Sequence, residues 1–322
     1  MEGNGRLVRG LGLVLALCGL LAVSLGCRSD IPESLAPSSG QTIELPLKDG
    51  SWTPQTTLSG RVPSGRGSIE IVDVGTFEFE VSSIETMRSD IFQEGHFSVF
   101  DILVALDDRG DIDLEYHYDP HMATHIIESL NGTPHWWYTA HYSEGWFETN
   151  VFRMDLYPYK DNTTIRVYST TEEYSASICQ TFGDEVRRLC RNDDIVVIPE
   201  VTIEDPVFIR HYEDVVVTAH DVRADALQHG VVTALDVLLS LGEQGELDSM
   251  KLTWYSSIRK ADPVDHYFVD RIDAAESRGR CGYVYEVGPQ RFSGFAGSHI
   301  HIPTDMRVLV SPEYALWFWI CI

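Results

Sequence analysis

Apolar and polar residues alternate along several short segments of the chain. Within residues 76–84, Phe77 and Phe79 fall on one face of an extended strand and Glu78 falls on the other. This period of two is typical of a strand with one buried face. Patterns of this kind predict two strand pairs, at 68–74 with 76–84 and at 207–212 with 215–220.

Two other segments, 98–109 and 233–244, have the spacing of amphipathic helices, with apolar residues recurring every three or four positions. Ser98 and Thr233 are N-cap candidates, and an Asp three residues after each completes a capping box. A glycine follows each helix at the C-cap position. Both helices therefore have local start and stop signals.

More strands are expected after each helix, at 124–130, 136–141 and 164–170, and at 267–272, 282–287 and 306–310. A strand pair, one helix and further strands form an α+β pattern in which the helix packs across a mixed sheet. The apolar segment 315–322 is too short to span a membrane. We interpret it as a central strand buried on both faces. The alternative is an exposed apolar surface that binds a partner.

Residues 88–113 and 223–248 are two copies of one segment, aligned without a gap at an offset of 135 residues. Nine of the 26 positions are identical. They include Arg88 and Arg223, Asp90 and Asp225, Gln93 and Gln228, and Gly95 and Gly230. The chain is therefore a duplicated module.

The N-terminus has the pattern of an export signal. Two arginines precede a 15-residue apolar run that ends just before Gly26 and Cys27. The sequence around Cys27 resembles a bacterial lipobox, which predicts lipidation of Cys27 and anchoring at a bacterial membrane, facing the periplasm or the cell exterior. The alternative is an ordinary cleaved signal peptide.

Composition and the repeat suggest five regions. We expect a signal at 1–27, a Pro- and Ser-rich flexible linker at 28–66 with one short strand near 41–47, a first domain at 67–170, a connector at 171–204 and a second domain at 205–322. Residues 182–189 of the connector are expected to form one or two helical turns.

The net charge is -25. So acidic a surface repels phosphate backbones, which makes nucleic acid an unsuitable partner. Cationic ligands, metal ions and basic proteins are easier partners.

Six cysteines are present. Cys18 lies in the signal and Cys27 is the lipidation candidate, so four remain for an oxidising compartment. Four cysteines allow three pairings, and we favour Cys179 with Cys190 and Cys281 with Cys321.

The second copy has the fuller set of motifs: TALDVLL from Thr233, YFVDRID from Tyr267, GYVYEVG from Gly282 and PTDMRV from Pro303. This set resembles the transcobalamin C-terminal-like domain of exported proteins. The resemblance implies two tandem β-grasp-like domains and a role in ligand binding, with a corrinoid or another flat molecule as the ligand.

His117, His121 and His125 recur every four residues. On a helix this spacing would stack imidazoles for a metal ion or haem iron, although Pro120 interrupts such a helix. The alternative is a surface loop rich in histidine.

Aromatic residues are densest around 136–147. An exposed strand face would let rings stack on a flat ligand, whereas burial of both faces would make them core. The ligand-binding candidates are Trp136, Trp137, Tyr138, Tyr142 and Trp146, with Tyr283 and Tyr285 in the second copy.

No nucleophile elbow, zinc-protease motif or phosphate-binding loop occurs in the sequence, so we expect no enzyme. Three hypotheses follow: capture of a small molecule, a protein-interaction or adhesion module of a surface complex, and metal or haem handling.

Overall fold

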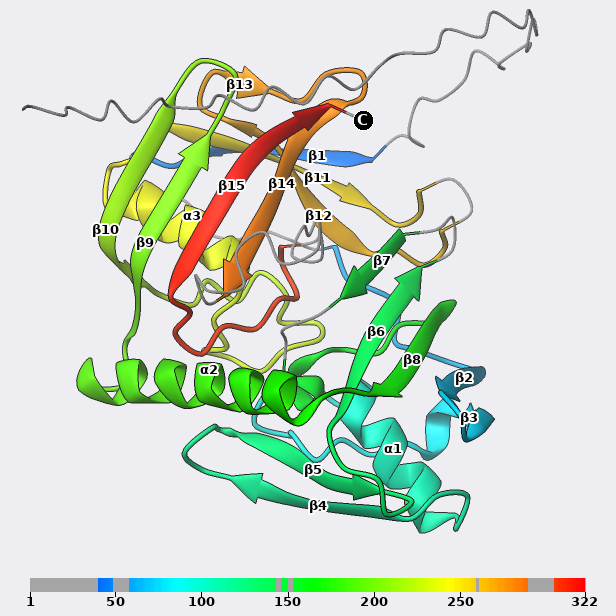
Figure 1. Ribbon diagram of the computed structural model, residues 1–322. Helices are drawn as coiled ribbons and strands as arrows, with labels where there is room; N and C mark the ends of the chain where they lie inside the picture. The colour runs from blue at the N-terminus through cyan, green and yellow to red at the C-terminus, as the bar shows by residue number, and fades with distance from the viewer. Residues whose placement is uncertain are drawn as a thin grey trace, which may run out of the picture. The chain divides into compact units, whose positions relative to one another are not determined.

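The first repeat is built on a mixed five-stranded sheet (Figure 1). The computed structural model describes residues 40–48, 58–142, 146–149, 153–258, 261–288 and 304–321. The sheet has the order β3-β2-β8-β6-β7, in which β2 and β8 are parallel and the other neighbours antiparallel. The strands are β2 (Arg66–Ile71), β3 (Gly75–Glu80), β6 (Trp136–Tyr142), β7 (Trp146–Thr149) and β8 (Thr163–Ser169).

The helix α1 (Val99–Asp108) follows the first hairpin, as the sequence predicted. Its capping box is complete, because Ser98 N donates to Asp101 Oδ2 over 2.6 Å and Asp101 N donates to Ser98 Oγ over 3.2 Å. Phe100 and Leu103 on the buried face of α1 lie in the core of the first repeat. A separate hairpin, β4 (Leu114–Asp119) with β5 (Thr124–Leu130), follows the helix.

The main sheet of the second repeat has the same order as the first four strands of the first sheet. This order is β10-β9-β15-β14, and β9 and β15 form the parallel pair. These strands are β9 (Val196–Glu204), β10 (Ile209–Val217), β14 (Cys281–Gly288) and β15 (Tyr314–Cys321). The helix α3 (Ala234–Glu243) has the predicted capping box between Thr233 and Asp236. The chain is therefore an α+β protein with a repeated topology.

A second sheet in this half has the order β1-β11-β12-β13. It contains β1 (Gln41–Pro46), β11 (Ser249–Tyr255), β12 (His266–Ile272) and β13 (Ala275–Glu276). The β11–β12 pair is the counterpart of the β4–β5 hairpin. β1 pairs with β11 along six residues, which agrees with the short strand expected near 41–47.

The first hairpin of the second repeat begins earlier in the chain than the sequence predicted. The sequence suggested strands at 207–212 and 215–220, but the hairpin runs from Val196 to Val217, so β9 begins inside the expected connector. Pro199 lies inside β9, at a position to which no described residue of β10 is paired. A strand tolerates proline there, because no N–H is needed for the ladder.

The strand expected at 306–310 forms only an isolated bridge between Val308 and Thr233. The strand equivalent to β8 is β15, the apolar C-terminal segment. It lies between β9 and β14, and its Trp317 is buried in the core. The central position agrees with the interpretation, but Leu316, Phe318 and Ile320 on the other face are only partly buried, so the strand is not buried on both faces.

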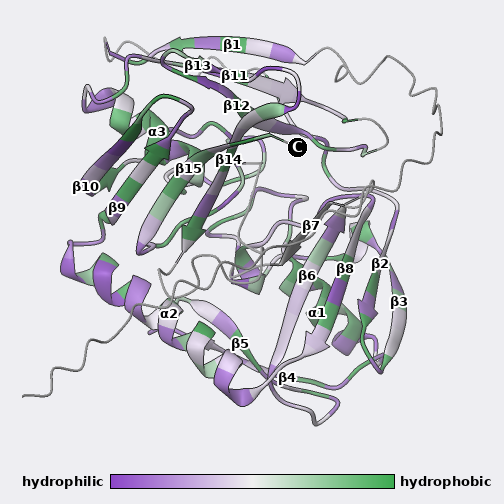
Figure 2. Ribbon diagram, turned by 45° about the horizontal axis from the view of Figure 1, so that its top comes forward, coloured by the Kyte–Doolittle hydropathy of each residue, from purple (hydrophilic) through white to green (hydrophobic). Residues whose placement is uncertain are grey.

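The connector forms α2 (Glu172–Arg191), a 20-residue helix rather than one or two turns. Thr171 caps it by accepting from Tyr174 N over 3.2 Å. Its Ile178 and Phe182 are buried in the core of the first repeat, whereas hydrophilic segments recur along its length (Figure 2). The helix therefore covers one face of the first sheet instead of merely joining two domains.

Candidate functional site

The duplicated segments meet each other across the interface between the repeats. Phe92 and Leu227, at equivalent positions, form an antiparallel bridge. Gln93 N donates to Ala226 O over 3.0 Å, and Gln228 N donates to Ile91 O over 2.8 Å. The repeats therefore contact each other through matching residues, as two subunits of a symmetric dimer do.

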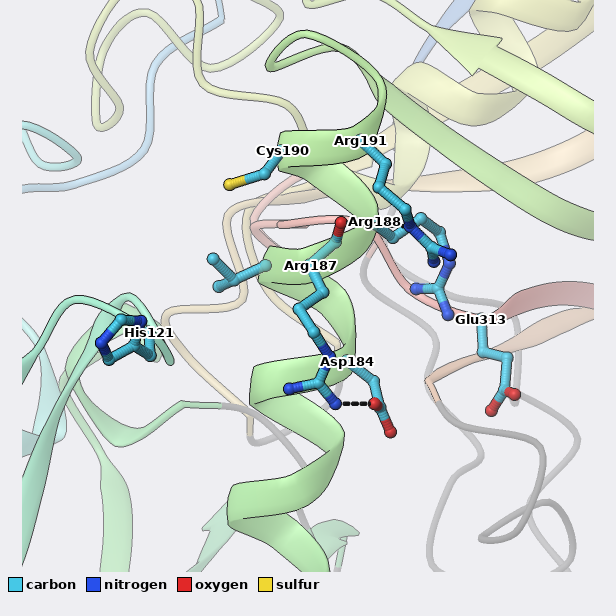
Figure 3. Close-up of a pocket in the computed structure, with 8 residues that line it drawn as sticks. His121, Asp184, Arg187, Arg188, Cys190, Arg191 and Glu313 are labelled. Carbon is cyan, nitrogen blue, oxygen red and sulfur yellow. Dashed lines mark hydrogen bonds and ion pairs between the residues drawn. The ribbon is translucent and has the colours of Figure 1, made fainter.

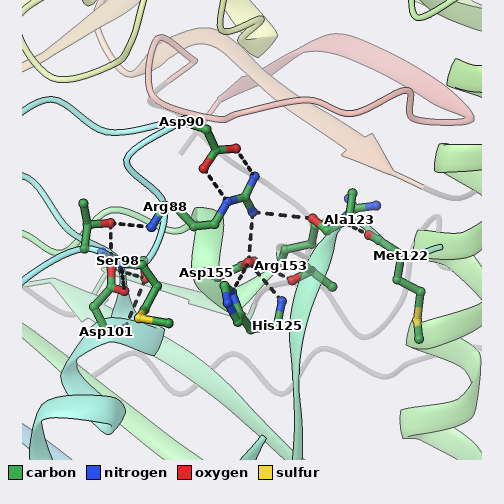
Figure 4. A network of polar contacts seen from close by, with 12 residues as sticks. Arg88, Asp90, Ser98, Asp101, Met122, Ala123, His125, Arg153 and Asp155 are labelled. Carbon is green, nitrogen blue, oxygen red and sulfur yellow. Dashed lines mark hydrogen bonds and ion pairs between the residues drawn. The ribbon is translucent and has the colours of Figure 1, made fainter. Parts of the chain in front are cut away.

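Beside this interface lies a buried polar network in the first repeat (Figure 4). Arg88 donates twice to Asp90, over 2.8 Å each, and once to Asp155, over 2.9 Å. Asp155 also accepts from the main-chain N of His125 and lies 3.0 Å from its Nδ1. The guanidinium thus links the repeat motif to the segment before β8.

The second repeat contains the equivalent network. Arg223 donates twice to Asp225, over 2.9 and 3.0 Å, and to Asp305 over 2.8 Å. Asp305 lies 2.7 Å from Nδ1 of His266 and accepts from Tyr267 N. An Arg, two Asp and one His are therefore arranged alike in both halves.

The charges in these networks are stabilised by one another. Burial raises the pKa of Asp305, but His266 and Arg223 outweigh this effect and hold its pKa below the usual range. Burial lowers the pKa of His266 to about 4. Because these side chains are paired with one another, each network holds together the chain segments that contribute to it. Among the contacts of the described residues, neither histidine lies against a hydroxyl or thiol nucleophile.

Sequence reasoning missed both networks as functional elements. The identity of Arg88 and Arg223, and of Asp90 and Asp225, was visible in the repeat. That identity was the available signal, since it marks the arginine and the first carboxylate of each network.

A groove of about 840 Å³ runs along the C-terminal part of α2 (Figure 3). Arg187, Arg188 and Arg191 line it, together with Asp184. Its other walls come from both repeats, through His121, in the turn between β4 and β5, and Glu313, just before β15. Arg187 pairs with Asp184, and Arg188 donates to the main-chain oxygen of Ser311.

The turn between β9 and β10 presents apolar side chains to solvent. Val207, Phe208 and Ile209 are 73%, 63% and 59% exposed, the highest values among the large apolar residues that the structure describes. Asp205 Oδ1 accepts from the main-chain N of both Val207 and Phe208 over 2.7 Å. This Asx turn fixes the exposed tip.

The aromatic candidates at the start of β6 are buried. Trp136 and Trp137 are each 8% exposed and Tyr138 is fully buried. Trp137 packs against Phe182 of α2, with ring centroids 6.2 Å apart. Of the two alternatives, burial of both faces therefore holds for these three residues, and Phe182 of α2 covers Trp137.

The aromatic candidates of the second repeat are buried as well. Tyr283 and Tyr285 are buried in the core of the second repeat. Tyr142 and Trp146 lie on β6 and β7, but their side chains fall outside what the structure describes.

The three histidines do not stack on a helix, because residues 114–130 form a hairpin. His117 lies 2.8 Å from Glu128, whereas His125 belongs to the Asp155 network on the opposite face of the hairpin. His121 is exposed in the turn. No cluster of three or more His, Cys, Asp or Glu suited to a metal ion occurs among the described residues, so the predicted helical metal site is wrong.

Cys281 and Cys321 form a disulfide between β14 and β15, which agrees with the favoured pairing. Cys179 and Cys190 are free, so the second favoured pair is wrong. They lie eleven residues apart on α2, about 16 Å along the helix axis, which is too far for a disulfide.

Cys27 lies outside the described residues. Within the described ranges, no helix is long and apolar enough to cross a bilayer. Comparison of the chain with family models, with curated proteins and with solved structures found no match.

Proposed function

We propose that this protein is an exported, lipid-anchored binding module without catalytic activity, built from two tandem β-grasp-like domains. Two features support the domain assignment and the resemblance to transcobalamin C-terminal-like domains. In each half, the first strand of the opening hairpin pairs in parallel with the last strand of the repeat. In each half, one capped helix also follows that hairpin. The lipid anchor is supported by the sequence before and at Cys27.

The binding function rests on one observation, the exposed apolar tip at Val207, Phe208 and Ile209. Three adjacent exposed apolar side chains are costly in water unless a partner covers them. Because the Asx turn of Asp205 holds the tip in one conformation, little entropy is lost when a partner binds. The tip therefore suits docking into an apolar pocket of another protein.

The hairpin that carries the tip is acidic. Glu200, Glu204, Glu213 and Asp214 are exposed on the same hairpin, and its Arg210 is paired with Asp273 and lies 3.8 Å from Asp205. An anionic membrane surface would repel this hairpin. We infer a protein partner whose apolar pocket has a basic rim.

The competing hypotheses have less support. The stacking of a flat molecule depended on aromatic rings that are buried at Trp136, Trp137 and Tyr138. Metal or haem handling depended on a histidine stack that the β4–β5 hairpin does not form.

Site-specific photo-crosslinking of the exported chain in its own cells tests the docking proposal. A crosslinker at Phe208 should give one defined protein adduct. A crosslinker at Val74, which is exposed on the β2–β3 turn of the first repeat, serves as the matched control. With the crosslinker at Val207, Phe208→Asp should abolish the adduct. Identical adducts from positions 208 and 74, or no adduct at 208, would refute the proposal.

A further inference from the structure

The α2 groove differs in charge from the rest of the protein. The chain has a net charge of -25, yet three arginines and two carboxylates line this groove. Asp184, Arg187, Arg188 and Arg191 are spaced three, four and seven residues apart, which places them on one stripe of the helix. Positive charges at such spacings repel one another unless an anion lies between them.

The three arginines of the stripe differ in the hydrogen bonds and ion pairs that their side chains form. Arg188 is bound to Ser311 O and so joins α2 to the second repeat. Arg187 forms an ion pair with Asp184, but its side chain is exposed to solvent. Arg191 donates its Nε to Arg187 O over 3.3 Å and forms no ion pair with any described residue. The guanidinium of Arg191 therefore has donors available, one turn from Arg187.

Helix capping explains only part of this arrangement. The C-terminus of a helix carries roughly half a negative charge, which favours cations in the last turn. The positive charge of three arginines is larger than this partial negative charge. Capping also does not require a concave site with walls from both repeats. The groove of about 840 Å³ has a volume that accepts small molecules.

We propose that the α2 groove is a binding site for an oxyanion, a carboxylate- or phosphate-bearing small molecule held by Arg187 and Arg191. Guanidinium groups bind both kinds of anion through paired N–H donors. The site is separate from the apolar tip, and its test does not depend on the docking partner.

Calorimetric titration of the full chain at low salt tests this site, with citrate and inorganic phosphate as probes. The double variant Arg187→Gln/Arg191→Gln should bind the preferred probe about tenfold more weakly or worse. Arg191→Lys should fall between the variant and the wild type, since it keeps the charge but loses the paired donors. The preferred probe distinguishes a carboxylate site from a phosphate site.

Arg66→Gln/Arg166→Gln is the matched control, since it removes the same charge from exposed arginines of the first sheet. It should leave affinity unchanged, and circular dichroism should show that all variants are folded. The proposal is overturned if the wild type binds neither probe, or if the groove variant and the control lose affinity equally.

Discussion

Gln93 and Gln228 occupy equivalent positions in the two repeats, and each donates its side-chain amide to a main-chain oxygen of the other repeat. Gln93 Nε2 bonds to Leu227 O over 3.1 Å, and Gln228 Nε2 bonds to Phe92 O over 2.9 Å. The exchange explains why this glutamine is identical in both copies, since each copy meets the same surface. The duplicated segment is therefore first of all an interface.

Replacing these glutamines should weaken the contact between the repeats. Each of Gln93→Ala and Gln228→Ala leaves a main-chain carbonyl without its partner, at a cost of about 1–2 kcal/mol in the free energy of unfolding. Urea denaturation measures this cost. Glu94→Ala, at an exposed neighbour, is the control and should change little. Equal stability of the glutamine variants and the control would show that the exchange contributes nothing.

The two buried carboxylates should be among the most sensitive positions. Asp155→Asn and Asp305→Asn each remove one of the two carboxylates that pair with a buried arginine, which should cost about 3–5 kcal/mol. The loss should be larger at Asp155, because the remaining partner of its arginine, Asp90, has a side chain that is 62% exposed and compensates the guanidinium less than Asp225, at 14% exposed, does for Arg223. Thermal or urea unfolding of both variants gives the comparison.

Asp90→Asn is the control for this pair, because an ion pair with an exposed carboxylate contributes about 1 kcal/mol or less. If Asp90→Asn destabilised the protein as much as Asp155→Asn, burial would not be what gives the network its strength.

Local signals were enough to predict α1 and α3. Ser98 and Thr233 cap their helices, and the apolar spacing that follows leaves little choice of structure. Long-range packing decided the rest. The expected connector extended to residue 204, but pairing with β10 and β15 draws β9 into the sheet. Trp137 lies in an aromatic strand that looked half-exposed, and only the position of Phe182 on α2 shows what covers it.

The candidate sites could be predicted only in part. Arg88 and Arg223 were visible as identities, but their partners Asp155 and Asp305 follow them by 67 and 82 residues. A constant offset cannot align residues whose intervening loops differ in length. The groove combines α2 with His121 and Glu313, which lie far apart in the sequence, so no local pattern could reveal it.

The cysteines should divide into one bonded and one free pair. Peptide mapping without reductant should link Cys281 to Cys321 and leave Cys179 and Cys190 as thiols. Cys190 is exposed and should react first with a thiol reagent, whereas burial raises the pKa of Cys179 and slows its reaction. A peptide linking Cys190 to Cys281 would contradict the structure.

Loss of the disulfide should destabilise the protein without unfolding it. Cys281→Ser/Cys321→Ser opens a loop spanning 40 residues, which corresponds to about 3–4 kcal/mol in the chain-entropy account. Cys179→Ser/Cys190→Ser is the matched control and should retain the stability of the wild type. Denaturant midpoints of the two double variants make the comparison.

Acid should weaken the second repeat and the interface well above the pH at which carboxylates titrate. Burial lowers the pKa of both His96 and His266 to about 4, whereas an unfolded chain protonates histidine near pH 6.5. Between about pH 6.5 and 4 the unfolded state therefore binds protons that the folded state does not, so stability falls as the pH falls. Each histidine accounts for roughly 3 kcal/mol at most.

His96 allows this pH dependence to be tested, because its buried Nε2 has no hydrogen-bond partner among the described residues. His96→Gln should reduce the slope of unfolding free energy against pH between 6.5 and 4. His229→Gln, at a side chain that is 93% exposed, is the control and should keep the slope. His220 acts in the opposite sense, because burial lowers its pKa but Asp236 and Glu243 together outweigh burial and raise it. An unchanged slope in His96→Gln would mean that this histidine is already solvated in the folded protein.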